Sequence, residues 1–243
     1  MHRLEILRQW VRESNHIVFF GGAGVSTESG IPDFRSVDGL YNQKFEYPPE
    51  QIISHTFFKR DPAYFFRFYR EKMLPLGFSP NVTHSVLAQW EQSGKLDGII
   101  TQNIDGLHQK AGSSNVQELH GSVYRNYCMR CGKFHDAQFV KNASGVPMCG
   151  CGGIVKPDVV LYEESLNQQT IENSVALLRS ADLLIVAGTS LTVYPAAGLI
   201  NYYSGRHMVL INREVTSYDD RADLVLHMQL GDVFAYLDKN PED

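Results

Sequence analysis

The chain has 243 residues, of which 43% are hydrophobic and 20% are charged, and its formal net charge is -5. This length suits one large domain, or one domain that carries a smaller inserted domain. The acidic balance argues against general nucleic-acid binding, and no apolar run approaches the length that crosses a bilayer. Because the first residues also lack the apolar core of a signal peptide, we expect a cytoplasmic protein that binds neither nucleic acid nor membranes.

The first third of the chain predicts a helix, a buried strand and a helical module. Residues 4–13 place Leu4, Leu7, Trp10 and Val11 on one helical face. The apolar run 17–20 predicts a parallel strand that enters a glycine-rich turn at 21–27. Residues 55–76 are rich in aromatic side chains and predict a small helical module, and residues 83–93 predict a further helix.

Strands and helices alternate through the rest of the chain, apart from an interruption at about 124–156. The predicted strands are 98–101, 183–187, 208–212 and 223–226, and the predicted helices are 168–180, 195–203 and 231–238. Such alternation predicts an α/β fold with a parallel sheet and right-handed crossovers.

The glycine-rich turn has two readings of about equal weight. Glycines after a strand let the backbone approach a phosphate, which suits a nucleotide site. The full dinucleotide fingerprint is missing, because Gly22-x-Gly24 is followed by Thr27 where a third glycine would stand, so a structural turn fits as well. Two further polar strand ends, Gly188-Thr189-Ser190 and Asn212, favour the nucleotide.

The strand at 98–101 also ends in polar residues, within the stretch Thr101-Gln102-Asn103-Ile104-Asp105. Open α/β sheets bind ligands at such strand ends. His120 lies nearby in sequence, beside Gly121, and is a candidate general base because imidazole titrates near neutral pH. Taken alone, a core histidine with satisfied hydrogen bonds is the better reading, and Gly121 together with the polar strand end upstream adds weight to the base. We interpret His108, on a predicted helix after Asp105, as structural.

All four cysteines lie in the interruption, as Cys128-x-x-Cys131 and Cys149-x-Cys151, with seventeen residues between the pairs. Two thiolate pairs on two turns suit tetrahedral zinc. Four protein ligands leave no open coordination position, so we expect one structural zinc ion. The sequence has no nucleophile elbow of the hydrolases and no His-Glu-x-x-His metal site, which suggests that a bound nucleotide takes part in the chemistry.

Taken jointly, these residues resemble the sirtuin family of NAD-dependent protein deacylases. The resemblance covers about residues 17–234 and is carried by Gly22-Ala23-Gly24-Val25-Ser26, Gly30-Ile31-Pro32-Asp33-Phe34-Arg35, Thr101-Gln102-Asn103-Ile104-Asp105, His120-Gly121, the four cysteines, Gly188-Thr189-Ser190-Leu191 and Asn212. It implies a Rossmann-like NAD-binding domain over 1–34, 77–122 and 157–243. It also implies a smaller domain over 35–76 and 123–156, made of a helical module and a zinc ribbon.

The resemblance assigns three groups of residues to NAD and one residue to catalysis. The phosphates and the nicotinamide ribose would lie against Ala23, Thr27, Phe34 and Arg35. The ribose and the nicotinamide pocket would be held by Gln102, Asn103, Ile104 and Asp105. The adenosine half would lie against Thr189, Ser190, Asn212, Asp232 and Val233. His120 would be the base.

The activity implied is deacetylation of protein lysine side chains, in which the acetyl group passes to ADP-ribose and nicotinamide is released. The partners would be acetyl-lysine proteins or peptides, and the oligomeric state stays open, with a monomer compatible with the sequence. Mono-ADP-ribosyl transfer to a protein is an alternative that uses the same cofactor. A non-enzymatic zinc-ribbon module that binds NAD is a weaker one.

The substrate peptide of the family lies extended and adds as a strand beside the enzyme. Here the matching enzyme segment is 159–162, so Val160, Leu161 and Tyr162 are candidate substrate-binding residues. Many members continue with Phe-Gly-Glu, whereas this chain reads Tyr162-Glu163-Glu164. We expect the replaced glycine to affect this loop and its peptide preference. The two carboxylates would favour basic residues beside the acetyl-lysine, although two solvated charges on a loop fit the sequence at least as well.

Overall fold

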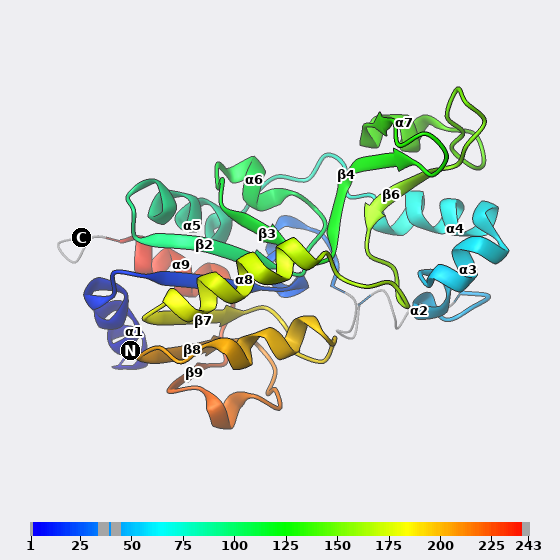
Figure 1. Cartoon of the computed structure of the whole chain (residues 1–243). Coiled ribbons are helices and arrows are strands. Elements are labelled where there is room, and N and C mark those ends of the chain that lie inside the picture. Colours follow the sequence, from blue (N-terminus) through cyan, green and yellow to red (C-terminus); the bar gives the residue numbers. More distant parts are fainter. Residues whose placement is uncertain (1, 34–38, 40–44, 240–243) are drawn as a thin grey trace.

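The computed structural model describes residues 2–33, 39 and 45–239, which form a large lobe and a small lobe (Figure 1). The large lobe contains a six-stranded sheet with the strand order β3-β2-β1-β7-β8-β9, and every pairing in it is parallel. Its strands are β1 (Ile17–Gly21), β2 (Leu96–Thr101), β3 (Val116–Glu118), β7 (Leu183–Ala187), β8 (His207–Ile211) and β9 (Leu224–Leu226). The predicted parallel α/β sheet is confirmed.

Both faces of this sheet are covered, which explains why its strands read as continuous apolar runs. Ile17 and Phe19 of β1 pack with one group of helices, and Val18 and Phe20 pack with another on the opposite face. The first group is α1 (His2–Glu13), α5 (Val82–Gln92) and α9 (Leu230–Asp238). The second is α8 (Gln168–Ser180) and the 3-10 helix η5 (Ala196–Tyr202), while the short α6 (Leu107–Ala111) contacts α5.

The order of the strands creates a place for a ligand beside β1. The chain runs from β1 to β2 and β3 on one side, and it returns to β7 on the other side of β1. Connections leave the carboxyl ends of β1 and β7 in opposite directions, and open α/β sheets bind ligands in the crevice at such a switch point. The turns after β1 are the 3-10 helices η1 (Ala23–Val25) and η2 (Thr27–Ser29), and a further 3-10 helix, η6 (Asp219–Arg221), precedes β9.

The small lobe combines a helical module with a three-stranded antiparallel sheet. The sheet has the order β5-β4-β6 and is made of β4 (Gly121–Cys128), β5 (Phe134–His135) and β6 (Val155–Val159), with α7 (Ala137–Asn142) beside it. The helical module contains α2 (Pro49–Ile52), α3 (His55–Arg60), α4 (Pro62–Phe68) and the π-helical turn η4 (Tyr69–Met73). One apolar cluster joins the two parts, because Phe57, Phe65 and Tyr69 pack in it with Val123 and Val155.

Both lobes differ in detail from the sequence-based expectation. The aromatic segment 55–76 is several short helices, because Asp61 caps a new helix and Pro62 occupies its first turn. The predicted helix 195–203 has 3-10 geometry. The proposed domain boundaries at 122/123 and 156/157 fall inside β4 and β6, which extend from the large lobe into the small one (Figure 1).

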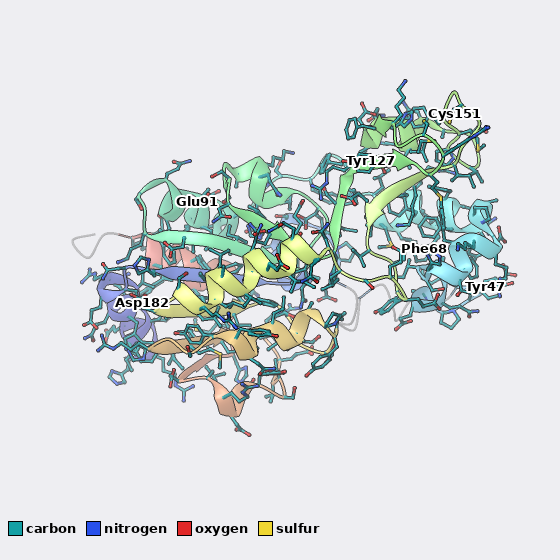
Figure 2. All side chains as sticks on the ribbon, viewed as in Figure 1. Tyr47, Phe68, Glu91, Tyr127, Cys151 and Asp182 are labelled. Atoms are coloured by element: carbon teal, nitrogen blue, oxygen red, sulfur yellow. The ribbon has the colours of Figure 1, made fainter. Side chains whose placement is uncertain are left out.

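Cys151 lies at the outer end of the small lobe and Phe68 in its helical module, whereas Asp182 lies on the far side of the large lobe (Figure 2). Among the described residues, the structure has no helix with the length and apolar character needed to cross a membrane.

Candidate active site

A cavity of about 350 Å³ lies where the carboxyl ends of the parallel strands meet the small lobe. Its wall brings together segments that are far apart in the sequence: the turn after β1, the loop after β2, the turn between β3 and β4, the end of β6 and the loop after β7. Most residues predicted to bind a ligand line it, namely Ala23, Thr27, Gln102, Asn103, Ile104, Asp105, His120, Val160, Leu161, Tyr162, Thr189, Ser190 and Asn212.

Four of the predicted NAD-binding residues are not placed at this cavity. Phe34 and Arg35 lie outside the described residues. Asp232 and Val233 are on α9 and do not line the cavity, and Val233 is 0% exposed because its side chain packs in the core beneath the sheet. The part of this region that does reach the cavity is the preceding segment Met228, Gln229 and Leu230, which the sequence reading missed.

Two glycine-containing turns meet at the switch point. The amide of Gly24 donates to the carbonyl oxygen of Gly188 at 2.8 Å, and the amide of Gly22 donates to Ala187 at 3.2 Å. A Cβ at position 24 would lie 2.7 Å from the Gly188 Cα, and a Cβ at position 188 would lie 2.7 Å from the Gly24 carbonyl carbon, so neither position could carry a side chain at this separation. The turn after β1 is thus both structural and part of the cavity wall, which joins the two readings of the sequence.

A buried chain of hydrogen bonds fixes the loop after β2. Asn103 Nδ2 donates to Ser26 Oγ at 3.0 Å, and Ser26 Oγ donates to Asp105 Oδ2 at 2.7 Å. Burial raises the pKa of Asp105, and the donors from Leu107 and Ser26 oppose this shift. Ser26 is 1% exposed and was not assigned a role from sequence, although it belongs to the Gly22–Ser26 motif. A serine inside a glycine turn carries no local signal for a contact 79 residues away.

The same loop is tied to the turn after β7. Thr189 Oγ1 donates to Gln102 Oε1 at 3.0 Å, and the amide of Gln102 donates to the Gly21 carbonyl. The ends of β1, β2 and β7 therefore form one hydrogen-bonded rim with polar side chains on it.

His120 has one ring nitrogen committed to the protein. Its Nδ1 lies 2.9 Å from the backbone carbonyl oxygen of Gln102. A carbonyl oxygen only accepts, so Nδ1 carries the proton of the neutral ring and Nε2 keeps its lone pair. Burial lowers the pKa of His120, partly offset by the bond to Gln102. The side chain therefore lines the cavity as a neutral imidazole at neutral pH.

The segment 160–162 is held in place by the protein itself. The amide of Val160 donates to His120 O at 3.0 Å, that of Leu161 to Glu164 Oε2 at 3.0 Å, and that of Tyr162 to Ile53 O at 3.0 Å. Its three amide donors are thus engaged within the protein. The segment therefore forms a fixed wall of the cavity, and a substrate strand would have to find its backbone donors elsewhere.

The two glutamates after this segment are also engaged internally. Glu164 accepts from His55 Nδ1 at 2.8 Å and from Lys156 Nζ at 3.0 Å. Glu163 accepts from the amide of Thr56 at 2.8 Å and has a φ of 75°, the left-handed region that favours glycine. Position 163 therefore has a backbone conformation that glycine adopts without strain, and the internal partners of both carboxylates reduce their availability to a basic peptide.

The four cysteines converge at the outer end of the small lobe. Their sulfur atoms all lie within 4.8 Å of one another, with 3.4 Å between Cys128 and Cys151 and 3.8 Å between Cys131 and Cys149. Zn–S bonds of about 2.3 Å in a tetrahedron separate sulfurs by about 3.8 Å, so this spacing fits a zinc ion. Backbone amides of Cys131 and Arg130 lower the pKa of the Cys128 thiol, whereas hydrogen bonds with Cys131 and Cys128 raise the pKa of Cys151.

His108 is away from this cavity, as expected for a structural residue. It is 1% exposed, and its ring lies 4.7 Å from that of His84 between α5 and α6.

Comparison with known proteins identifies the family. Residues 22–195 match the model of the Sir2 family. An NAD-dependent protein deacetylase of Clostridium acetobutylicum is 58% identical over 96% of this chain and 97% of its own length. The NAD-dependent protein deacetylase of Cutibacterium acnes is 55% identical over 93% of this chain and 94% of its own.

Solved structures agree with these relatives. A Sir2 complex with a deacetylated p53 peptide and 3'-O-acetyl ADP ribose has a TM-score of 0.90 and 38% identity, with 97% of both chains covered. A Sir2 complex with a p53 peptide and NAD+ has a TM-score of 0.84 and 40% identity, with 95% of both covered. The fold, the cavity residues and relatives that match nearly the whole length lead to one conclusion: the chain belongs to the Sir2 family.

Proposed function

We propose that the protein is an NAD-dependent protein lysine deacetylase that transfers the acetyl group to ADP-ribose and releases nicotinamide. The observation that carries the proposal is the buried, neutral His120, whose Nε2 is free to act as a base while Nδ1 is held by Gln102. Relatives that are 55–58% identical are named NAD-dependent protein deacetylases, which supports the same activity.

The cavity residues fit NAD. Ala23 and Thr27 would lie beside its phosphates and the nicotinamide ribose, and Phe34 and Arg35 would complete this part. The loop Gln102–Asp105 would hold the ribose and nicotinamide, with Asn103 and Asp105 kept in place through Ser26. Thr189, Ser190 and Asn212 would contact the adenosine half. Asp232 and Val233, which the resemblance also assigns to the adenosine half, follow closely after the cavity-lining residues 228–230.

NAD, when bound, supplies an electron-poor sugar carbon and a leaving group, so no protein nucleophile is needed. The chain's own residues bind and orient NAD and the acetyl-lysine, and one water molecule is consumed as the free lysine amine is released. The role of His120 is to take a proton from a ribose hydroxyl at Nε2, while the Gln102 carbonyl holds its ring and stabilises the charged form. A base with a pKa below its usual value is already neutral at neutral pH.

The substrate would be an acetyl-lysine in a protein or peptide, which enters between the two lobes. Related solved structures include Sir2 bound to an acetylated peptide. Val160, Leu161 and Tyr162 would border the acetyl-lysine, because they line the cavity next to His120. A single zinc ion would be held by Cys128, Cys131, Cys149 and Cys151, with no open position for catalysis.

One experiment separates deacetylation from ADP-ribosyl transfer. The protein is incubated with NAD and an acetyl-lysine peptide, and the peptide is analysed by mass spectrometry. Loss of the acetyl group supports the proposal. Gain of ADP-ribose by the peptide would instead assign mono-ADP-ribosyl transfer, and an unchanged peptide with intact NAD would assign a module that only binds.

A further inference from the structure

Two strands, one from each sheet, lead to the cavity, and the residues that follow them are hydrogen-bonded to each other at its wall. The first is β3, which ends at Glu118, two residues before His120. The second is β6, which leads through Asp158 to Val160. They are joined where the Val160 amide donates to the His120 carbonyl at 3.0 Å, so the base and the wall of the substrate site are direct neighbours.

The two segments are unusually close at Gly121, the residue after the base. Gly121 has a φ of 75°, and a Cβ there would lie 1.8 Å from the Asp158 carbonyl oxygen. The relative position of His120 and the segment 160–162 therefore depends on contacts that hold β3, β4 and β6 together at this point.

An irregularity in β4 supplies such a contact. The pairing of β4 with β6 shifts register between Ser122 and Asn126, so residues 123–125 bulge out of the ladder. Bulges redirect side chains and are frequent beside active sites. Here the amide of Val123 donates to Ile104 O at 3.0 Å, which anchors the bulge to the loop after β2.

The third bulge residue, Arg125, bridges the two segments. Its Nη1 lies 2.6 Å from Glu118 Oε2 and its Nε lies 2.7 Å from Asp158 Oδ2. Glu118 belongs to the parallel sheet, whereas Asp158 belongs to the antiparallel sheet of the small lobe. The Glu118 side chain is only 8% exposed, so this arm of the bridge is shielded from water and weakly screened by salt. A planar guanidinium can hold two carboxylates at fixed angles, which an ammonium cannot.

We propose that Arg125 is a positioning residue, which sets the distance between the base His120 and the substrate-bordering segment 160–162 by bridging Glu118 to Asp158. The inference rests on the proposed deacetylase activity and concerns one step of it. Arg125 touches neither NAD nor substrate, because its guanidinium is occupied by the two carboxylates and it does not line the cavity.

The test compares two reactions of the same protein. In the proposed sequence of events nicotinamide leaves before His120 takes its proton. Exchange of labelled nicotinamide into NAD, in the presence of acetyl-peptide, therefore reports the departure of nicotinamide alone. Peptide deacetylation reports that departure together with the later proton transfer to His120. Misplacement of a catalytic group by about 1 Å lowers rates by about 10²-fold. Arg125→Gln should lower kcat for deacetylation about 10- to 100-fold, leave exchange within about 3-fold, and leave the KM for NAD nearly unchanged.

Three further variants make the test specific. Arg125→Lys should restore little, because its single nitrogen cannot occupy both the Nη1 and the Nε donor positions that face the two carboxylates. Asp158→Asn removes only the more exposed arm, so it should also lower kcat for deacetylation more than nicotinamide exchange, but by a smaller factor than Arg125→Gln does. The double variant with Arg125→Gln should be almost no slower in deacetylation than Arg125→Gln alone. Arg206→Gln is the matched control, since this exposed arginine only approaches Glu13 at 4.0 Å, far from the cavity in sequence and structure.

Equal losses of exchange and deacetylation in Arg125→Gln would overturn the proposal, as would full activity of Arg125→Lys or an additive double variant. A wild-type protein inactive in both reactions would refute the deacetylase assignment itself.

Discussion

The Nδ1 atom of His120 donates to the carbonyl oxygen of Gln102 at 2.9 Å, and this bond fixes which ring nitrogen can act as a base. Burial lowers the pKa of His120 below its ordinary value. Since a base must be unprotonated, kcat/KM for deacetylation should fall on the acid side with a midpoint below about pH 6.5.

A pH profile of kcat/KM for an acetyl-peptide at saturating NAD measures this midpoint. A midpoint above about 6.5 would mean that the base is a more exposed or differently paired group.

The pair of buried histidines between α5 and α6 should make the protein sensitive to acid. Burial lowers the pKa of His84 to about 4, and burial together with the neighbouring His84 lowers that of His108 well below its usual value. Because the unfolded chain protonates at about 6.5, this stability is fully present above pH 6.5 and is lost as the pH falls towards 4. The expected slope is about 1.4 kcal/mol per pH unit for each histidine.

Urea unfolding at about pH 7 and about pH 5 tests this slope, with His108→Leu as the variant. The variant should lose less free energy of unfolding between the two pH values than the wild type does. Identical losses would show that these rings do not set the acid sensitivity.

Glu164 should act on peptide binding through the loop that it holds. It accepts from Lys156, His55 and the Leu161 amide, so Glu164→Gln weakens the support of the wall formed by 160–162. We expect the KM for the acetyl-peptide to rise several-fold, with the KM for NAD little changed, and stability to fall by about 1 kcal/mol.

Steady-state kinetics with each substrate varied in turn measures both constants. Glu172→Gln is a suitable control, because that carboxylate lies on the exposed side of α8 and accepts only from Gln168. A larger change in the KM for NAD than in that for the peptide would contradict this role for Glu164.

The cysteine cluster should hold one zinc ion whose loss unfolds the small lobe. Thiolate–zinc bonding contributes directly to folding, and a zinc ion would tie together two cysteine pairs that are separated in the chain by β5 and α7. Cys128→Ala should therefore lose zinc, thermal stability and activity together. Metal analysis of the purified protein and thermal unfolding measure this, and a stable, active Cys128→Ala variant without zinc would disprove a structural role.

The sequence predicted those features that depend on local pattern. Apolar runs revealed the parallel strands, because a strand covered on both faces has few polar positions. The cysteine spacing predicted a cluster that the structure confirms as a geometric site. The six-stranded sheet also explains why Gln102, Thr189 and Ser26, which are distant in sequence, share one rim. They follow β2, β7 and β1, which are neighbouring strands of that sheet.

Other features depend on tertiary contacts that leave no local signature. The bulge in β4 breaks the alternation of its side chains, so a strand over Gly121–Cys128 is hard to recognise. Ser26 gains its role from Asn103 and Asp105, and Glu163 takes a glycine conformation that is tied by Thr56. Val233 faces the core because α9 packs against α1 and α5, which places residues 228–230 at the cavity instead.

The most direct test of the account is the coupling of NAD consumption to loss of the acetyl group. Wild type and His120→Ala are each incubated with NAD and an acetyl-lysine peptide, and nicotinamide and deacetylated peptide are quantified in the same samples. We predict equal amounts of both products with the wild type and a deacetylation rate about 10²- to 10⁴-fold lower in His120→Ala. Nicotinamide release by the wild type without deacetylated peptide, or an equally active His120→Ala, would contradict it.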